Sequence, residues 1–185
     1  MLEQIKQWDR ELFVYLNSLG LESYDSFWIF ITNPAHWIPL YFIFFILYFT
    51  AFDWRKASFT GLFLMLAFFS TYILTNFVKN LALRLRPNNT PDLKDLIRVL
   101  QTPTNYSFFS GHAASSFVIT TFVVLSLRHK YRWVYVFYLW PILFGWSRIY
   151  VGVHFPGDVF VGAVVGTSMA VIFYNIYQKA EKRFL

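Results

Sequence analysis

Two histidines and one aspartate stand out in a chain that is otherwise dominated by apolar side chains. His154 and Asp158 are four residues apart at the start of an apolar run, and His112 is close to the start of another. Because four residues make about one helical turn, the Asp158 carboxylate can reach back to one imidazole nitrogen of His154. This contact fixes the tautomer and leaves the other nitrogen free to attack an electrophile. The second histidine is then available to protonate a leaving group.

Two cations precede these groups in the chain. Lys79 and Arg86 are seven residues apart, which is nearly two helical turns. We expect both side chains to project from one face of a helix that ends near Arg86, because Pro87 disfavours helical backbone in the residue before it. Arg84 is expected to point elsewhere. On their own, two such cations are also consistent with side chains that extend to the membrane interface.

A third group of residues can bind an anion. Ser110 is a good N-cap, Gly111 lets another group approach the backbone, and the unpaired amides at a helix start bind anions. Arg148 adds a further cation. Helix caps and an interfacial arginine give the same pattern, but the clusters together describe a cradle for phosphate, which carries up to two negative charges. Asp158 is the only well-placed carboxylate, so we predict no metal site and no metal cofactor.

The composition indicates that these groups are positioned by membrane helices. Of 185 residues, 57% are hydrophobic and 14% are charged, whereas a soluble domain carries about 25% charged residues. The mean hydropathy is +0.44. There are no cysteines, which excludes disulfides and thiolate metal sites. The net charge of +6 comes from residues at segment ends, so we expect the lipid bilayer as a partner, and no nucleic acid.

The pattern predicts an all-α, integral-membrane helical bundle of about five to six helices in a single domain, residues 1–185. Residues 1–22 form an N-terminal amphipathic helix, which lies in the membrane interface or packs as an ordinary surface helix. The predicted membrane helices are residues 27–52, 57–86, 110–127, 133–148 and 156–177. Residues 87–109 form a loop on the active face, and Leu93–Leu100 within it is either a short amphipathic helix or a plain connector.

Five spans place the two ends of the chain on opposite sides of the membrane. Basic residues are equally numerous on both sides, so the positive-inside rule decides only through the short loops. The tight connectors and the C-terminal tail are basic, which places them in the cytoplasm. The phosphate cradle then lies on the extracytoplasmic face, and a bacterial inner (plasma) membrane is the expected location.

Three motifs in sequence resemble those of the type-2 phosphatidic-acid phosphatase family of membrane enzymes, over roughly residues 57–177. The first is matched by Lys79, Arg86 and Pro87. The second is matched by Ser110, Gly111 and His112, with Phe109 where a proline is usual. The third is matched in full by Ser147, Arg148, His154 and Asp158.

The resemblance implies a role for each matched residue. His154 is the implied nucleophile, which forms a phosphohistidine, and Asp158 orients it. His112 donates a proton to the leaving group and later helps to activate water. The implied phosphate-binding groups are Lys79, Arg86, Arg148, Ser110 and the amide of Gly111. No metal cofactor is implied, and Phe109 bears on substrate preference rather than on activity.

These observations predict a lipid phosphatase whose substrate is a lipid phosphate in the membrane. Undecaprenyl diphosphate is the first candidate, followed by phosphatidylglycerol phosphate, phosphatidic acid and lipid A phosphate. Phosphotransfer from one lipid to another is an alternative, because the same phosphohistidine serves it. A vanadate-dependent haloperoxidase has a similar site, but the apolar spans argue against it. A lipid-phosphate binding protein is the non-enzyme alternative.

Overall fold

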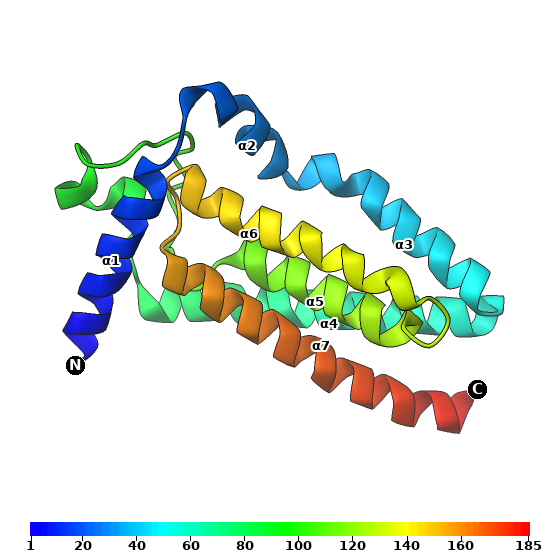
Figure 1. The fold of residues 1–185 in the computed structure, drawn as a ribbon. Helices are drawn as coiled ribbons and strands as arrows, with labels where there is room; N and C mark the ends of the chain where they lie inside the picture. The colour runs from blue at the N-terminus through cyan, green and yellow to red at the C-terminus, as the bar shows by residue number, and fades with distance from the viewer.

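The computed structural model describes the backbone of residues 1–185 and every side chain except that of Leu2. As predicted, the described chain is all-helical (Figure 1). Its α-helices are α1 (Leu2–Ser18), α2 (Asp25–Ile31), α3 (Ile38–Ala51), α4 (Trp54–Ala82), α5 (Gly111–Leu127), α6 (Leu139–Tyr150) and α7 (Pro156–Phe184). Short 3₁₀ helices cover Glu22–Tyr24, Pro34–Trp37, Pro87–Asn89, Pro91–Leu93 and Arg132–Tyr138.

Three helical stretches are long and apolar enough to cross a membrane, and they begin at Pro34, Trp54 and Pro156. The other two predicted spans are shorter or split. α5 has 17 residues, and the span predicted over residues 133–148 is divided between the 3₁₀ helix Arg132–Tyr138 and α6. The helices α4 to α7 run side by side along the bundle, and α3 leans away from them (Figure 1).

The segment over residues 27–52 is broken where a proline follows an asparagine. The Asn33 side chain accepts a hydrogen bond from the Ala35 amide at 3.0 Å, and Pro34 occupies the first position of the following turn. Both features start a new helix rather than continue the previous one. The break leaves Thr32 buried beside α6, where it enters the site described below.

Two glycines bring the backbones of α5 and α7 into contact. A Cβ atom at Gly162 would lie 2.6 Å from the Ser110 carbonyl oxygen, and one at Gly166 would lie 2.3 Å from the Ala114 carbonyl oxygen. Small residues four apart allow such close helix packing in membranes. This contact fixes the start of α5 beside the start of α7.

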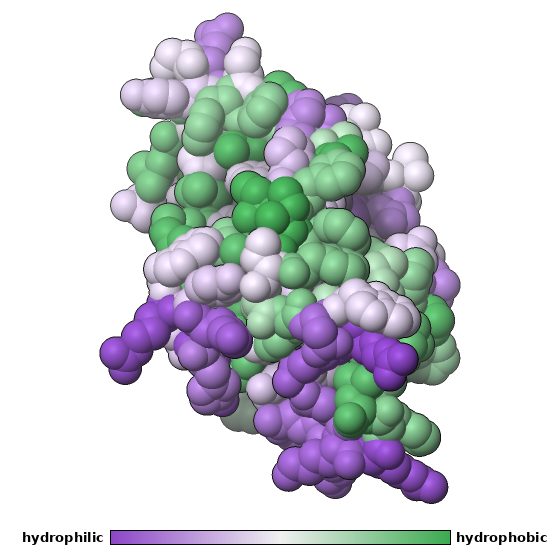
Figure 2. Space-filling model, turned by 90° about the vertical axis from the view of Figure 1, so that its right-hand side faces the viewer, coloured by the Kyte–Doolittle hydropathy of each residue, from purple (hydrophilic) through white to green (hydrophobic). Residues whose placement is uncertain are grey.

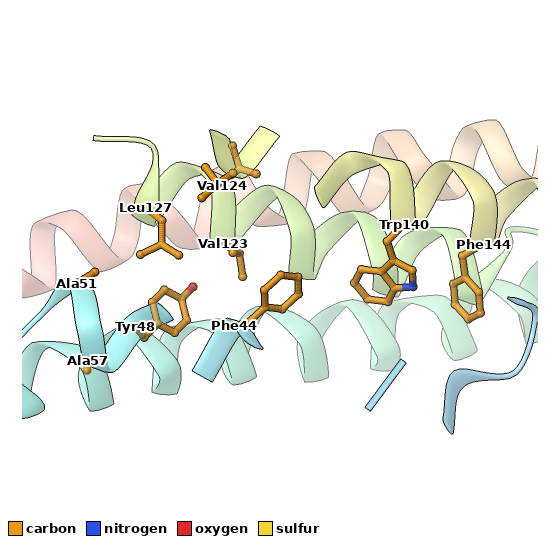
Figure 3. Close-up of a cluster of buried hydrophobic side chains, with 10 residues drawn as sticks. Phe44, Tyr48, Ala51, Ala57, Val123, Val124, Leu127, Trp140 and Phe144 are labelled. Atoms are coloured by element: carbon orange, nitrogen blue, oxygen red, sulfur yellow. The ribbon is translucent and has the colours of Figure 1, made fainter. Parts of the chain in front are cut away.

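Aromatic side chains fill the space between α3, α5 and α6 (Figure 3). Phe44 and Tyr48 of α3 pack with Trp140 and Phe144 of α6, and Leu127 of α5 belongs to the same cluster. The Trp140 and Phe144 rings are 6.0 Å apart and stacked. Because Phe144 also contacts the ring of His112 at 4.9 Å, the apolar core continues directly into the polar end of the bundle.

In the segment after α4, one expectation was wrong and one open alternative is decided. α4 ends at Ala82, because Leu83 adopts a left-handed conformation (φ 49°) and its amide bonds the Lys79 carbonyl. The helix therefore ends four residues before the predicted end at residue 86. Of the two alternatives for Leu93–Leu100, the structure has the plain connector: the Leu100 amide bonds the Val151 carbonyl, and the Arg98 amide bonds the Asn17 side chain.

The two ends of the bundle are built from different segments. α1 lies across the end where α7 begins, and the long loop between α4 and α5 lies at the same end (Figure 1). Figure 2 views the opposite end, where most hydrophilic side chains lie in the lower part of the view and hydrophobic ones predominate in the middle. That opposite end carries the connectors 52–54 and 128–131 and the C-terminal turn of α7.

Candidate active site

The first turn of α7 and the start of α5 are joined through Asp158. The Phe155 amide donates to the Asp158 Oδ2 atom at 3.1 Å. The Ser110 amide donates to the Asp158 main-chain oxygen at 2.9 Å. An aspartate in the first turn also complements the positive end of the helix. Asp158 is fully buried, so its carboxylate faces only protein groups.

His154 lies between Asp158 and Arg86. Its Nδ1 atom is 3.4 Å from Asp158 Oδ2, as the four-residue spacing predicts. Arg86 Nη1 lies 3.0 Å from Nε2 on the other side of the ring. A guanidinium can only donate, so Nε2 accepts, and the hydrogen of the neutral ring lies on Nδ1, facing Asp158. Nε2 therefore presents its lone pair to the cation.

Burial and neighbouring positive charge act together on this histidine. His154 is only 1% exposed. Burial first, and then the charge of Arg86 and Arg148, lower the pKa of His154 well below its ordinary value. Asp158 does little to offset this, because its carboxylate is already paired with Arg84 at 2.7 Å. The neutral ring is the form that can attack as a nucleophile.

Arg86 is held by several hydrogen bonds, although it does not lie on α4. It precedes the 3₁₀ turn Pro87–Asn89. Its Nε donates to the Asn105 carbonyl and its Nη2 to the Asn105 side chain, both at 2.8 Å. Its Nη1 donates to the Val153 carbonyl at 2.9 Å. The prediction that Lys79 and Arg86 share one helix face was thus wrong, because the helix ends between them.

Lys79 reaches the same place from the last turn of α4. Its Nζ donates to the carbonyl of Tyr106 at 2.6 Å and to that of Ser107 at 2.9 Å. The lysine is 6% exposed. Both cations therefore meet the loop segment 105–107, and the structure brings them together by a route that helical spacing did not predict.

Arg148 and His112 complete the polar cluster. Arg148 Nη1 contacts the Thr32 hydroxyl and donates to Gln101 Oε1 at 3.0 Å. In the described part of the chain, its buried Nε has no hydrogen-bond partner, so it can still bind an anion. His112 in the first turn of α5 is within electrostatic range of His154, Arg148, Arg86 and Lys79.

The helix start supplies the remaining predicted groups. The Ser110 side chain accepts from the Ala113 amide at 3.4 Å and is fully buried. Gly111 is the first residue of α5. The amides of this first turn are among those that a helix leaves without an intrahelical partner. They point out of α5 at the end where His112 and Asp158 lie, and such amides favour an anion.

Two residues that sequence analysis missed belong to this cluster. Ser107 Oγ donates a hydrogen bond to Asp158 Oδ2 and lies 3.4 Å from His154 Nδ1. Arg84, which was expected to point elsewhere, donates to Asp158 Oδ1 at 2.7 Å. That expectation was wrong because α4 ends at Ala82, so helical spacing does not govern the direction of Arg84.

Comparison with known proteins assigns the family. The family model described as the PAP2 superfamily matches residues 60–182, a range that includes the three predicted motifs. The chain belongs to the PAP2 superfamily. This confirms the resemblance to type-2 phosphatidic-acid phosphatases. With helical stretches that can cross a membrane, this PAP2 chain is an integral membrane protein and a phosphatase of that family.

Relatives of the PAP2 chain include the lipid A 4'-phosphatase of Bacteroides thetaiotaomicron, which is 29% identical over 188 residues. That match covers 99% of this chain and 83% of the relative. The undecaprenyl-diphosphatase of Sulfolobus acidocaldarius is 26% identical over 170 residues, which cover 90% of this chain and 77% of the relative.

The fold of the PAP2 chain is also that of a solved structure. The transmembrane PAP2 type phosphatidylglycerolphosphate phosphatase from Bacillus subtilis superposes with a TM-score of 0.77 at 21% identity. The superposition covers 95% of this chain and 87% of that structure. The predicted membrane bundle is thereby confirmed.

Proposed function

We propose that this protein hydrolyses a phosphate group from a membrane lipid through a phosphohistidine on His154. The observation that carries the proposal is the position of His154, whose two ring nitrogens face a carboxylate on one side and a guanidinium on the other. The contact with Asp158 orients the nucleophile, and the Arg86 guanidinium can neutralise the charge of a phosphate. Two more cations, Lys79 and Arg148, lie within electrostatic range of the same ring.

In the first step, the incoming phosphate replaces Nε2 as the acceptor of the Arg86 Nη1 hydrogen bond, and this frees the Nε2 lone pair. Nε2 attacks phosphorus, and the bond from phosphorus to the lipid oxygen breaks. His112 donates its proton to that oxygen, which leaves as an alcohol or, from a diphosphate, as a phosphate. The dianionic phosphate offsets the surrounding positive charge, so His112 can carry this proton. The Gly111 amide and Arg148 hold the phosphate oxygens while charge develops on them.

In the second step, water attacks the phosphohistidine. His112, now without its proton, accepts one from the attacking water, the bond between phosphorus and Nε2 breaks, and inorganic phosphate leaves. Asp158 accepts the Nδ1 hydrogen bond in both steps and stabilises the positive charge of the phosphorylated ring. We assign Asp158 the roles of orienting the ring and stabilising its charge. Its carboxylate lies 3.4 Å from Nδ1 and also binds the Phe155 amide and Arg84.

The substrate that we favour is a phosphate monoester of the lipid A type. The support is the relative named as a lipid A 4'-phosphatase, to which this chain aligns over 99% of its length. Undecaprenyl diphosphate is the second candidate, supported by a relative that aligns over 90% of the chain. Both substrates place a phosphate at the membrane surface, which fits a site at the end of a bundle on the extracytoplasmic face of a bacterial inner membrane.

The test uses purified protein in detergent with chelator present. Lipid A carrying phosphates at both sugar positions, undecaprenyl diphosphate and phosphatidylglycerol phosphate are offered separately. Released phosphate is counted, and mass spectrometry identifies the position that lost it. We expect release from lipid A at the greatest kcat/KM, and loss of release from every substrate in His154→Ala.

The control is His129→Ala, since His129 is exposed in the connector at the far end of the bundle. It should retain full turnover. Release from His154→Ala at the rate of the unchanged protein would contradict the proposal. Transfer of phosphate to a second lipid without release would identify a phosphotransferase, and binding without turnover would identify a lipid-phosphate binding protein.

A further inference from the structure

One guanidinium bridges two carboxylates at the edge of the candidate site. Arg84 Nη1 donates to Asp158 Oδ1 and Arg84 Nη2 donates to Asp9 Oδ2, both at 2.7 Å. The guanidinium also lies 4.1 Å from the centre of the Phe155 ring. Two carboxylates and one aromatic face therefore fix the plane of this side chain, which is the kind of fork geometry that arginine provides and lysine does not.

The second carboxylate belongs to the N-terminal helix, far away in sequence. Asp9 Oδ1 accepts a hydrogen bond from the Gly157 amide at 2.7 Å. A Cβ atom at position 157 would lie 2.9 Å from Asp9 Oδ2, so the absence of a side chain at Gly157 is what admits the carboxylate. Asp9 thus contacts both Arg84 and the first turn of α7, one residue before Asp158.

The three charged side chains are largely buried, so the loss of any one of these contacts should be costly. The side chains of Asp158, Asp9 and Arg84 are 0%, 13% and 25% exposed. A buried carboxylate whose cation is removed is left without compensation for its charge. Oδ1 of Asp158 is held by Arg84, and this fixes the direction in which Oδ2 faces His154 Nδ1.

We propose that Arg84 and Asp9 are positioning residues that hold Asp158 in the orientation required by His154, and that α1 is thereby part of the catalytic apparatus. This inference rests on the proposed function, since it assigns to Asp158 the role of orienting the nucleophile. We assign neither residue a contact with the phosphate. Arg84 acts through Asp158, and Asp9 acts through Arg84 and the Gly157 amide.

The test compares Arg84→Gln, Arg84→Lys and Asp9→Asn in the phosphate-release assay. Arg84→Gln should lower kcat roughly a hundredfold with KM nearly unchanged, as expected when a catalytic group is misplaced by about 1 Å. Arg84→Lys should recover part of the loss, because it keeps the charge but not the fork. Asp9→Asn, which keeps Arg84, should lower kcat about tenfold, because a hydrogen bond to a charged group contributes about 1.5–3 kcal/mol and about 1.4 kcal/mol is tenfold.

The matched control is Arg10→Gln, on the residue next to Asp9. Arg10 pairs with Asp92 at 3.4 Å, and Asp92 is 80% exposed, so its loss should change neither kcat nor KM. A second control measures coupling. In an Asp158→Asn protein, Arg84→Gln should cost almost nothing more, whereas a purely structural role of Arg84 would cost the same in both backgrounds.

Thermal unfolding in detergent accompanies every variant, and Asp9→Asn carries the test if Arg84→Gln does not fold. Wild-type kcat in Arg84→Gln, or in Asp9→Asn where Arg84→Gln does not fold, would overturn the inference, as would full additivity with Asp158→Asn. His154→Ala in the same assay separates the two proposals. Turnover by His154→Ala overturns the proposed function, whereas an inactive His154→Ala beside a fully active Arg84→Gln overturns only the positioning role.

Discussion

Ser107 occupies a position that only the folded chain reveals. Its hydroxyl touches both Asp158 Oδ2 and His154 Nδ1, and its carbonyl accepts a hydrogen bond from Lys79. One loop residue thus contacts a proposed nucleophile, its orienting carboxylate and a phosphate-binding cation. We infer that the loop between α4 and α5 sets the geometry of the site as much as the helices do.

Ser107→Ala should therefore lower kcat by about 10- to 100-fold, because a hydrogen bond to a charged group contributes about 1.5–3 kcal/mol. KM should change little, since the main-chain contact to Lys79 remains. The measurement is phosphate release under saturating substrate. Ser115→Ala is the matched control, because the Ser115 hydroxyl bonds only main-chain oxygens of Gly111 and His112. Equal activity of the two variants would contradict the prediction.

The pH dependence follows from the environment of His154. Burial and nearby cations lower its folded-state pKa well below 6.5, so Nε2 remains unprotonated at neutral pH. We expect kcat/KM to stay level near pH 7 and to fall only on an acid limb well below pH 6.5. An acid limb centred at or above pH 6.5 would contradict this assignment.

The stability of the fold should fall with decreasing pH, as the activity does. Between the folded and unfolded pKa values, the unfolded chain binds the additional proton, so the free energy of unfolding falls as pH drops below about 6.5. Above that pH, His154 is neutral in both the folded and the unfolded chain, so its full contribution to the free energy of unfolding is present. Chemical denaturation at pH 7.5 and at pH 5.5 measures the difference in the free energy of unfolding between the two pH values. This difference should be smaller in His154→Phe.

The sequence predicted the residues of the three motifs because their types and spacing are unusual in an apolar chain. It did not predict Thr32 and Gln101, which contact Arg148, because single uncharged polar residues in breaks and loops carry no periodic signal. Arg84 was missed for a different reason. Its direction depends on the left-handed residue Leu83, and leucine gives no local indication of such a turn.

Among the helices, α5 and α7 depend most on small residues. Gly166→Ala places a Cβ atom 2.3 Å from the Ala114 carbonyl oxygen, so the two helices must separate. Overpacking of this kind costs about 1–3 kcal/mol. We expect a lower unfolding temperature in detergent and a loss of activity, because the start of α5 moves away from Asp158.

Gly61→Ala is the control for the same substitution. A Cβ atom at Gly61 meets no described atom within 4 Å, and alanine is favoured over glycine in a helix by up to about 1 kcal/mol. Its unfolding temperature should equal or exceed that of the unchanged protein. A Gly166→Ala protein as stable as Gly61→Ala would show that the close approach of α5 and α7 is not required.

α1 illustrates which helix face a sequence can predict. Ile5, Trp8 and Leu12 recur at helical spacing on this predicted amphipathic helix, and their side chains are 51%, 59% and 47% exposed in the structure. The face that packs on the protein instead carries Phe13 and Asn17, both fully buried. The Asn17 amide bonds the main-chain oxygens of Arg98, Ile149 and Tyr150, contacts that hydrophobic periodicity cannot reveal.

At the scale of the whole molecule, the proposed orientation can be tested directly because the chain has no cysteine. Lys94 is exposed at the site end and Lys130 is exposed at the opposite end. Single Lys94→Cys and Lys130→Cys variants would be treated in intact cells with a maleimide that cannot cross membranes. We expect labelling of Lys94→Cys in intact cells, and of Lys130→Cys only after permeabilisation. The reverse pattern would place the site in the cytoplasm.

α4 and α7 each have 29 residues, or about 43 Å at 1.5 Å per residue. This equals the thickness of a bilayer with its head groups, about 40–45 Å, so the polar groups at one end of both helices lie at the height of lipid phosphates. A thicker bilayer raises those phosphates above the helix ends, and a thinner one drops them below. Such hydrophobic mismatch costs fractions of a kcal/mol per Å. We therefore expect the acyl-chain length of the surrounding lipids to change how readily a head group enters the candidate site.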